Sequence, residues 1–515
     1  MSQPSRALPW WFAIPIATLG GVAYTFAFPG ASIWALAFVS IGLAIVPLIG
    51  QRLWVSFLAG LGFGLSFYLT HVAWTGRYLG PVPWIALSTL EALLIAVGAP
   101  LVTLAYRWLG ASDRPLIRGL LLPAVVAALW VAREQVTSSF PYGGFPWGRL
   151  ALSQADSPYV ALVSWVGIAG LGYLMVFVTM SFVEWMRATN RFTAAALVVL
   201  MPALLIAALA VFVPQYATTT TGSLRLALVQ GNGPAGYFDE RRPGDVLKSQ
   251  VAATARITDA QASGVDLVVW PEGSVDASLD DPAIAARLDA VASRFRAPIL
   301  ANTVTVRGER YFNTSLVWAE GRGITAHYDK RNPVPFGEYI PDREFWRSLA
   351  PSLVDLVQRG YSAGTNSPSV KVDGTEVGLA ICFDVAYDNI IWEGARDGAG
   401  LYIMQTNNAD FRGTDENQQQ LAIARIRAVE TGRSVVNLST VGASQVIGAN
   451  GQALHELRLN QPDSLAADVE SRTGLTPAVA LGGWLPIGIS MFGLGALLLA
   501  GIGARLTGRQ ATRNR

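Results

Sequence analysis

Three side chains with complementary chemistry occur in the second half of the chain: Glu272, Lys330 and Cys382. Cys382 is the only cysteine among 515 residues, and it follows EVGLAI (376–381), where alternating apolar residues predict a buried strand. A thiol at the end of a rigid strand is well held for attack on a bound carbonyl group. A lone cysteine also often serves as a small apolar core residue, so taken alone it leaves both interpretations open.

Glu272 and Lys330 also follow strand-like runs. Glu272 follows VDLVVW (265–270) after one proline, and a carboxylate at the rim of an apolar strand loses hydration, which raises its pKa and suits it to proton transfer. The proline-rich stretch after Lys330 is expected to form a turn that holds Glu338 nearby. Each of these residues is also compatible with an ordinary exposed charge, because exposed charges greatly outnumber catalytic ones.

Six phrases resemble the nitrilase superfamily and, more narrowly, its membrane-bound branch, the apolipoprotein N-acyltransferase family. They are GGFPWG (143–148), VQGN (229–232), WPEG (270–273), YDKRNPVPFGEYIP (328–341), ICFD (381–384) and QTNNADF (405–411). The long phrase around Lys330 is the most specific. The resemblance covers nearly the whole chain. It implies an α-helical membrane bundle of eight spans plus an extracytoplasmic, nitrilase-like α/β domain built as an αββα sandwich.

The resemblance also implies a reaction. A Glu-Lys-Cys triad would use Cys382 as the nucleophile, Glu272 as the general base and Lys330 as the cation that stabilises the oxyanion. The acyl chain of a membrane phospholipid would pass through a cysteine thioester to the N-terminal amine of a diacylglyceryl-cysteine on a lipoprotein. Elementary chemistry agrees, because a free thiol has a pKa of about 8.5 and a nearby ammonium favours the thiolate. No metal or organic cofactor is expected.

Supporting positions follow from the same resemblance. Glu338 is expected to orient the lysine or the substrate amine, and Phe383, Asp384 and Asn407 are expected to line the site. Two positions depart from the family pattern: Asp384 is a shorter acid than usual, and Asp410 stands where better-known members carry tryptophan.

The composition indicates a membrane protein, with 52% apolar and 14% charged residues and a mean hydropathy of +0.37. Apolar runs of about 20 residues predict membrane-spanning helices. We expect spans near 9–28, 32–50, 54–74, 83–106, 117–136, 158–183, 194–214 and 478–503. Arginines are more frequent in the loops that lie on the side of the N-terminus, and the tail 504–515 is basic, so both ends are expected in the bacterial cytoplasm.

The chain is expected to consist of seven spans (1–215), a catalytic domain (222–472) outside the cytoplasmic membrane, the eighth span and the tail. A polar break with four consecutive threonines, Gln215 to Gly222, is read as a linker. Strands alternate with helices in the following domain, which indicates an α/β fold. Helices are predicted over 245–262, 282–295 and 416–431, and strands over 224–230, 265–270, 297–304, 376–382, 401–406, 434–440 and 443–449.

The segment 345–362 joins apolar and charged residues. It is read either as an amphipathic helix packed on its own domain or as a membrane-dipping lid over the site.

Several functions are disfavoured. The formal charge of +2, without a basic run, disfavours nucleic acid as a partner, and His71, His327 and His455 lack ligand spacing for zinc. Two alternatives stay open: a membrane-tethered amidase of small amides, and a non-catalytic membrane scaffold. Eight spans favour lipid substrates over small amides, and the intact triad argues against a scaffold.

Overall fold

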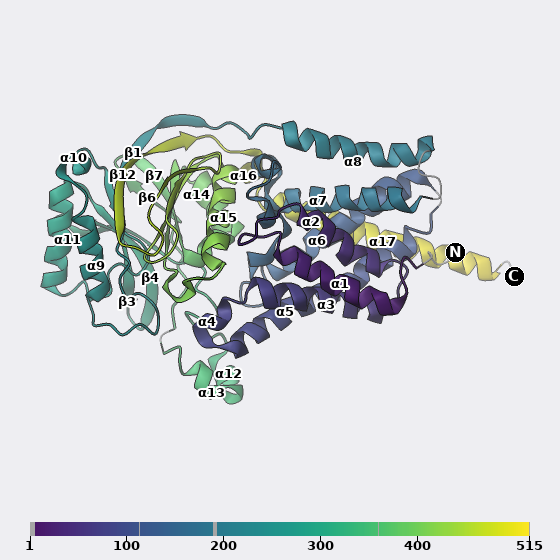
Figure 1. Cartoon of the computed structure of the whole chain (residues 1–515), viewed down its shortest axis with the longest axis horizontal. Helices are drawn as coiled ribbons and strands as arrows, with labels where there is room; N and C mark the ends of the chain where they lie inside the picture. Colours follow the sequence, from purple (N-terminus) through teal and green to yellow (C-terminus); the bar gives the residue numbers. More distant parts are fainter. Residues whose placement is uncertain (1–5, 113, 189–192, 359, 514–515) are drawn as a thin grey trace. The chain divides into compact units, whose positions relative to one another are not determined.

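The computed structural model describes residues 6–112, 114–188, 193–358 and 360–513, and the chain divides into two compact units (Figure 1). The helical unit comprises the chain up to Gly76, Gly80–Pro214 and the chain from Leu481. The α/β unit comprises Gln215–Ala480 together with the short segment Arg77–Leu79.

Each predicted span overlaps a helix of the helical unit. These helices are α1 (Trp10–Thr25), α2 (Leu36–Ile45), α3 (Leu53–His71), α5 (Pro81–Trp108), α6 (Leu122–Thr137), α7 (Val163–Arg187), α8 (Ala194–Phe212) and α17 (Trp484–Arg513). Shorter helical turns lie between them, namely η1 (Val46–Leu48), α4 (Thr75–Leu79), η2 (Ile117–Leu121), η3 (Pro146–Gly148), η4 (Leu150–Gln154) and η5 (Val160–Leu162). The predicted run 478–503 is divided, because α16 (Pro477–Leu481) ends at Gly482, which has a φ of 50°.

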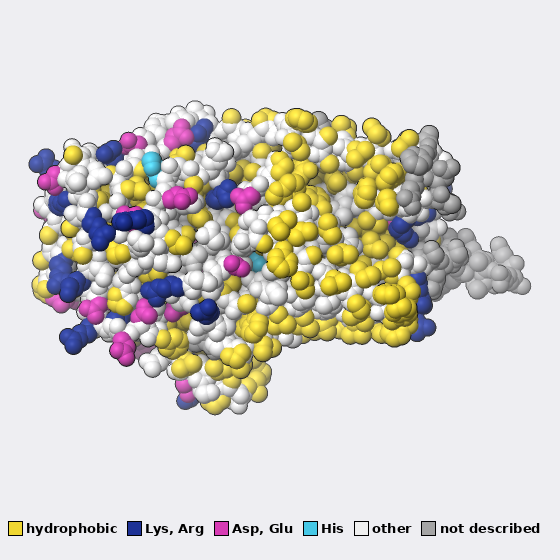
Figure 2. Space-filling model, viewed as in Figure 1, with side chains coloured by type: hydrophobic (Ala, Val, Ile, Leu, Met, Phe, Trp, Pro, Cys, Tyr) yellow, Lys and Arg dark blue, Asp and Glu magenta, His cyan; other side chains and the backbone are white. Residues whose placement is uncertain are grey.

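Among the described residues, five helices are long and apolar enough to cross a membrane. They are Leu53–His71, Pro81–Trp108, Ile117–Thr137, Val160–Arg187 and Trp484–Leu506. With 16 and 10 residues, α1 and α2 are shorter than the roughly 20 residues that span a bilayer. Hydrophobic side chains cover the visible face of the helical unit, whereas charged side chains are spread over the α/β unit (Figure 2).

The α/β unit contains two six-stranded sheets. Their orders are β12-β1-β2-β3-β4-β5 and β11-β10-β9-β8-β7-β6. The strands of the first sheet are β1 (Thr219–Gln230), β2 (Leu267–Val269), β3 (Ile299–Arg307), β4 (Arg310–Ala319), β5 (Gly323–Asp329) and β12 (Asp463–Thr473). Those of the second are β6 (Ser369–Val372), β7 (Thr375–Ile381), β8 (Leu401–Thr406), β9 (Ser434–Ser439), β10 (Gln445–Ile447) and β11 (Ala453–Glu456).

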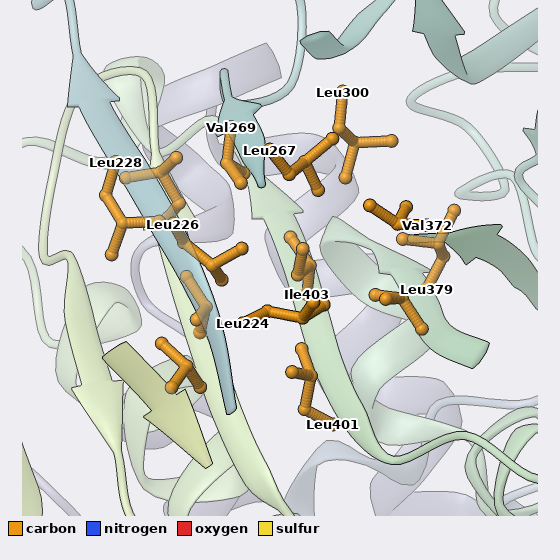
Figure 3. Close-up of a cluster of buried hydrophobic side chains, with 14 of the residues drawn as sticks. Leu224, Leu226, Leu228, Leu267, Val269, Leu300, Val372, Leu379, Leu401 and Ile403 are labelled. Atoms are coloured by element: carbon orange, nitrogen blue, oxygen red, sulfur yellow. The ribbon is translucent and has the colours of Figure 1, made fainter. Parts of the chain in front are cut away.

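The two sheets pack face to face around one apolar cluster. Leu226 of β1 and Val269 of β2 contribute to it from the first sheet, and Leu379 of β7 and Ile403 of β8 from the second (Figure 3). Because successive side chains of a strand point to opposite faces, Ala227 of β1 belongs to a different cluster on the outer face of the first sheet.

Helices cover both outer faces (Figure 1). The first sheet is covered by α9 (Asp245–Thr254) and α11 (Pro282–Phe295), and the second by α14 (Asp388–Arg396) and α15 (Glu416–Thr431). The unit also contains α10 (Asp259–Ala262), η6 (Cys382–Ala386), η7 (Ala409–Phe411), α12 (Arg343–Leu349) and α13 (Pro351–Val354). The layers are therefore those of an αββα sandwich.

Most predicted elements occur with small shifts, but two predictions were wrong in detail. The stretch read as a linker enters β1 at Thr219, because the threonines pair with β12, which the sequence analysis did not predict. The helix expected over 245–262 is interrupted, since Thr258 and Gln261 form a capping box that starts α10 afresh. By contrast, α11 and α15 have the predicted bounds, and Gly432 closes α15 in the left-handed conformation.

Candidate active site

Three strand ends bring the sequence-predicted residues together. Glu272 follows β2, Lys330 follows β5, and Cys382 follows β7, so each side chain is carried by a short connection anchored in a sheet. Lys330 is additionally fixed by its backbone, whose N–H donates to the carbonyl of Asn313 on β4 at 2.8 Å. The two facing sheets, rather than one, supply the site.

Cys382 lies at a sharp turn between β7 and η6. Its φ is 51°, a left-handed conformation that a non-glycine residue rarely adopts, and its exposure is intermediate. The buried carboxylate of Asp384 braces this turn by accepting hydrogen bonds from the Tyr328 hydroxyl (2.8 Å), the Asn332 N–H (3.0 Å) and the Ile381 N–H (3.4 Å). Backbone strain maintained by such a network is typical of functional positions.

Lys330 lies between two acids. Its Nζ is 2.8 Å from a carboxylate oxygen of Glu338 and 3.8 Å from one of Glu272, and the lysine side chain is only 1% exposed. Asn313 bridges the same acids, because its Nδ2 donates to Glu272 at 2.8 Å and to Glu338 at 3.1 Å. The Glu338 oxygen that pairs with Lys330 also accepts the Val334 N–H at 2.7 Å. Every charged group of this cluster therefore has a fixed partner.

Burial and mutual charge set the protonation of the cluster. Burial raises the pKa of Glu272, and the charge of Lys330 lowers this pKa in part. The thiol of Cys382 hydrogen-bonds to the Glu272 carboxylate, which also lowers the pKa of Glu272. Burial also raises the pKa of Cys382 well above its usual range, and the charge of Glu272 raises it further, whereas Lys330 lowers it. Burial lowers the pKa of Lys330, but Glu338, Cys382 and Glu272 outweigh this effect and the lysine stays charged.

This arrangement can carry out acyl transfer through sulfur. A thiol hydrogen-bonded to a carboxylate with a raised pKa can pass its proton directly to that carboxylate. A permanently charged, buried lysine beside the sulfur can stabilise negative charge on a carbonyl oxygen that is under attack.

The other predicted positions lie around this cluster with mainly structural contacts. Phe383 is nearly buried and packs edge-on against Tyr387, with ring centroids 5.2 Å apart. Asn407 donates to the carbonyl of Ala235 at 2.9 Å. Asp410, at the departure from the family pattern, accepts the N–H of Tyr237 at 2.9 Å and thereby ties the connection after β8 to the one after β1.

The sequence analysis did not single out four residues that contact these groups: Asn313, Asn408, Glu416 and Gln420. Asn408 lies inside the phrase QTNNADF, but the other three carry no local signal, because they occur within an ordinary strand and helix. The side-chain amide nitrogen of Gln420 lies 3.8 Å from Cys382 Sγ.

The segment 345–362 does not form one amphipathic helix. It contains the end of α12 and the short α13, and its apolar side chains divide into two groups. Val354 and Val357 are buried, whereas Phe345 is 57% and Leu349 is 64% exposed. The segment therefore has a buried apolar part and an exposed apolar part.

Comparison with known proteins gives a consistent result along the chain. Residues 20–181 match the apolipoprotein N-acyltransferase N-terminal domain, and residues 225–478 match the carbon-nitrogen hydrolase family. The apolipoprotein N-acyltransferase of Mycolicibacterium smegmatis is 32% identical over 93% of this chain and 84% of its own length. The one of Azotobacter vinelandii is 29% identical over 95% of this chain and 96% of its own length.

Solved structures similar to the chain come from the nitrilase superfamily. A Saccharomyces cerevisiae protein of branch 10 of that superfamily has 18% identity and a TM-score of 0.38 over 49% of this chain and 92% of its own. An amidase from Nesterenkonia sp. has 21% identity and a TM-score of 0.37 over 49% of this chain and 93% of its own.

Proposed function

The chain belongs to the apolipoprotein N-acyltransferase family, and we propose that it acylates lipoproteins through a thioester on Cys382. The acyl donor is a membrane phospholipid, and the acceptor is the N-terminal amine of a diacylglyceryl-cysteine. Glu272 acts as the general base, Lys330 stabilises the oxyanion, and Glu338 holds the lysine.

In the first half-reaction, Glu272 takes the thiol proton and the sulfur attacks the ester carbonyl carbon of the phospholipid. The C–S bond forms, the ester C–O bond breaks, and Glu272 returns the proton to the departing lysophospholipid alkoxide. In the second half-reaction, the lipoprotein amine attacks the thioester, the C–N bond forms and the C–S bond breaks. The amine proton passes to Glu272 and from there to the sulfur, so no further reactant is required.

The observation that carries this proposal is the left-handed turn that holds Cys382 where the largely buried Glu272 and the buried Lys330 act on its thiol. A purely structural cysteine needs neither the strained backbone nor the charged neighbours, which are costly to bury. We take the same cluster as support against a non-catalytic scaffold.

We propose further that the chain crosses the bacterial cytoplasmic membrane eight times, with the α/β unit on the outer face. The support is five helices of sufficient length, together with arginines concentrated on the side of the N-terminus and in the basic tail. A single cysteine in place of the exposed Leu459, introduced into the Cys382→Ala variant, should react with a membrane-impermeant maleimide in intact spheroplasts. Labelling only after lysis would reject the outer placement.

The decisive experiment is mass spectrometry of the purified protein after incubation with phospholipid vesicles. An acyl adduct on the only thiol is expected in the parent protein and not in Cys382→Ala. Adding a diacylated lipopeptide should discharge the adduct and yield the triacylated peptide. If the adduct is instead released as free fatty acid while the lipopeptide stays unmodified, the protein is a hydrolase, as in the amidase alternative. Triacylation by folded Cys382→Ala would reject the proposal.

A further inference from the structure

Three polar side chains beside Cys382 have no part in the mechanism described above. Gln420 and Glu416 lie on the first turns of α15, and Asn408 lies in the connection before it. All three are 2% exposed or less. Gln420 Nε2 is 3.8 Å from Cys382 Sγ, within reach of a hydrogen bond to sulfur.

The neighbours of Gln420 determine which end of its amide faces the sulfur. Asn408 Oδ1 is placed to accept from the hydroxyls of Ser439 (2.7 Å) and Thr406 (3.1 Å), and the Asn408 amide nitrogen faces Glu416 and Gln420. That nitrogen donates to Gln420 Oε1 at 2.9 Å and also to the carboxyl of Glu416. With its oxygen thus engaged, Gln420 presents its N–H donors to Cys382.

We propose that Gln420 donates a hydrogen bond that stabilises the thiolate of Cys382, and that Asn408 and Glu416 are positioning residues that hold Gln420 in this orientation. The inference rests on the proposed function in one respect, namely that Cys382 is the nucleophile. Hydrogen bonds to ionised acceptors are stronger than those to neutral ones, so this donor favours the thiolate over the thiol. The same preference assists the second half-reaction, in which thiolate is the leaving group.

A neutral donor is well suited to this position because the sulfur already lies among several charges. Glu272 after β2, Lys330 after β5, Glu338 in the following turn and Glu416 on α15 all act on the thiol. Burial raises the pKa of Glu416 to about 8, so this acid is mostly uncharged at neutral pH and repels the thiolate little. The amide therefore supplies stabilisation without a second cation that would compete with Lys330 for the carboxylates.

The single cysteine permits a direct test. The rate of alkylation by iodoacetamide, measured against pH on the full chain in detergent, reports the thiolate fraction of Cys382 alone. Gln420→Met keeps the side-chain volume but removes the donor, and the midpoint should rise by about one pH unit, which makes alkylation at pH 7 about tenfold slower. Gln420→Glu, of the same shape, should raise the midpoint further because it places an acceptor or a charge beside the sulfur.

The matched control is Gln418→Met on the same helix, where the side chain is exposed, and its midpoint should equal that of the parent. Thermal unfolding of each variant verifies that it is folded, and if Gln420→Met does not fold, Gln420→Glu decides. Unchanged midpoints in folded Gln420 variants would overturn this inference while leaving the thioester mechanism intact. Triacylation by Cys382→Ala would instead overturn the proposed function, whatever the alkylation data show.

Discussion

Lys330 forms its shorter ion pair with Glu338, at 2.8 Å, and not with the proposed general base Glu272, which lies at 3.8 Å. The lysine charge is thus held mainly by an acid that has no direct part in proton transfer. This leaves the carboxylate of Glu272 with a raised pKa and available as a base.

Glu338→Gln should therefore alter proton transfer as well as the position of the lysine. The negative charge of Glu338 raises the pKa of Glu272, so its removal should lower that pKa. The proposed mechanism requires ionised Glu272, and consequently the acidic limb of the pH–rate profile should move to lower pH. The maximal rate should fall roughly 100-fold, because the base becomes weaker and Lys330 loses its main partner.

The measurement is the pH dependence of lipopeptide acylation, with Glu344→Gln, an exposed acid of α12, as the control. A Glu338→Gln profile that coincides with the parent profile would contradict the role given to this ion pair.

Glu272→Gln should separate thiol reactivity from acyl transfer. Because the charge of Glu272 raises the pKa of Cys382, its removal leaves the attraction of Lys330 less opposed, and the pKa of the thiol should fall. Iodoacetamide should then alkylate Cys382 faster at pH 7, although acyl transfer falls roughly 100-fold or more without the base. Slower alkylation in the folded variant would show that the carboxylate promotes thiolate formation in the resting protein.

Glu416 should make the folded state less stable as pH rises. Its pKa is raised by burial from 4.5 to about 8 in the folded protein, so between these values the folded state binds more protons than the unfolded state. The free energy of unfolding should thus decrease across that window, by on the order of 4 kcal/mol for this group alone. Glu416→Gln keeps an acceptor for Asn408 and does not titrate, so its melting temperature should depend less on pH from 5 to 8. Parallel melting curves of the two proteins against pH would refute this expectation.

The exposed apolar side chains of α12 should matter for bilayer substrates only. Phe345→Ser combined with Leu349→Ser removes apolar surface that is mostly exposed, so folding should be little affected. We expect a drop in acylation from phospholipid vesicles with unchanged turnover of a short soluble ester. Leu459→Ser, at an equally exposed site, serves as the control. An equal loss with both substrates would mean that the segment supports the site and does not act as a membrane lid.

The sequence alone was sufficient to predict those features that depend on residues close together in the chain. The period-2 alternation around Leu226 and Leu379 indicated buried strands, and Gly432 after Thr431 marked the end of α15, because a cap acts within one turn. The family phrases selected Glu272, Lys330 and Cys382 as partners, although they lie 58 and 52 residues apart along the chain.

Only the tertiary structure decided how these residues meet and which others join them. The pairing of β1 with β12, nearly 250 residues away, made the end of an apparent linker part of β1, the second strand of the first sheet. Three contacts of the site depend on side chains from separate strands and helices. Lys330 lies closer to Glu338 than to Glu272, Asn313 bridges these two acids, and Gln420 approaches the sulfur of Cys382. Such contacts arise when the two sheets pack against each other, and no spacing along one chain segment records them.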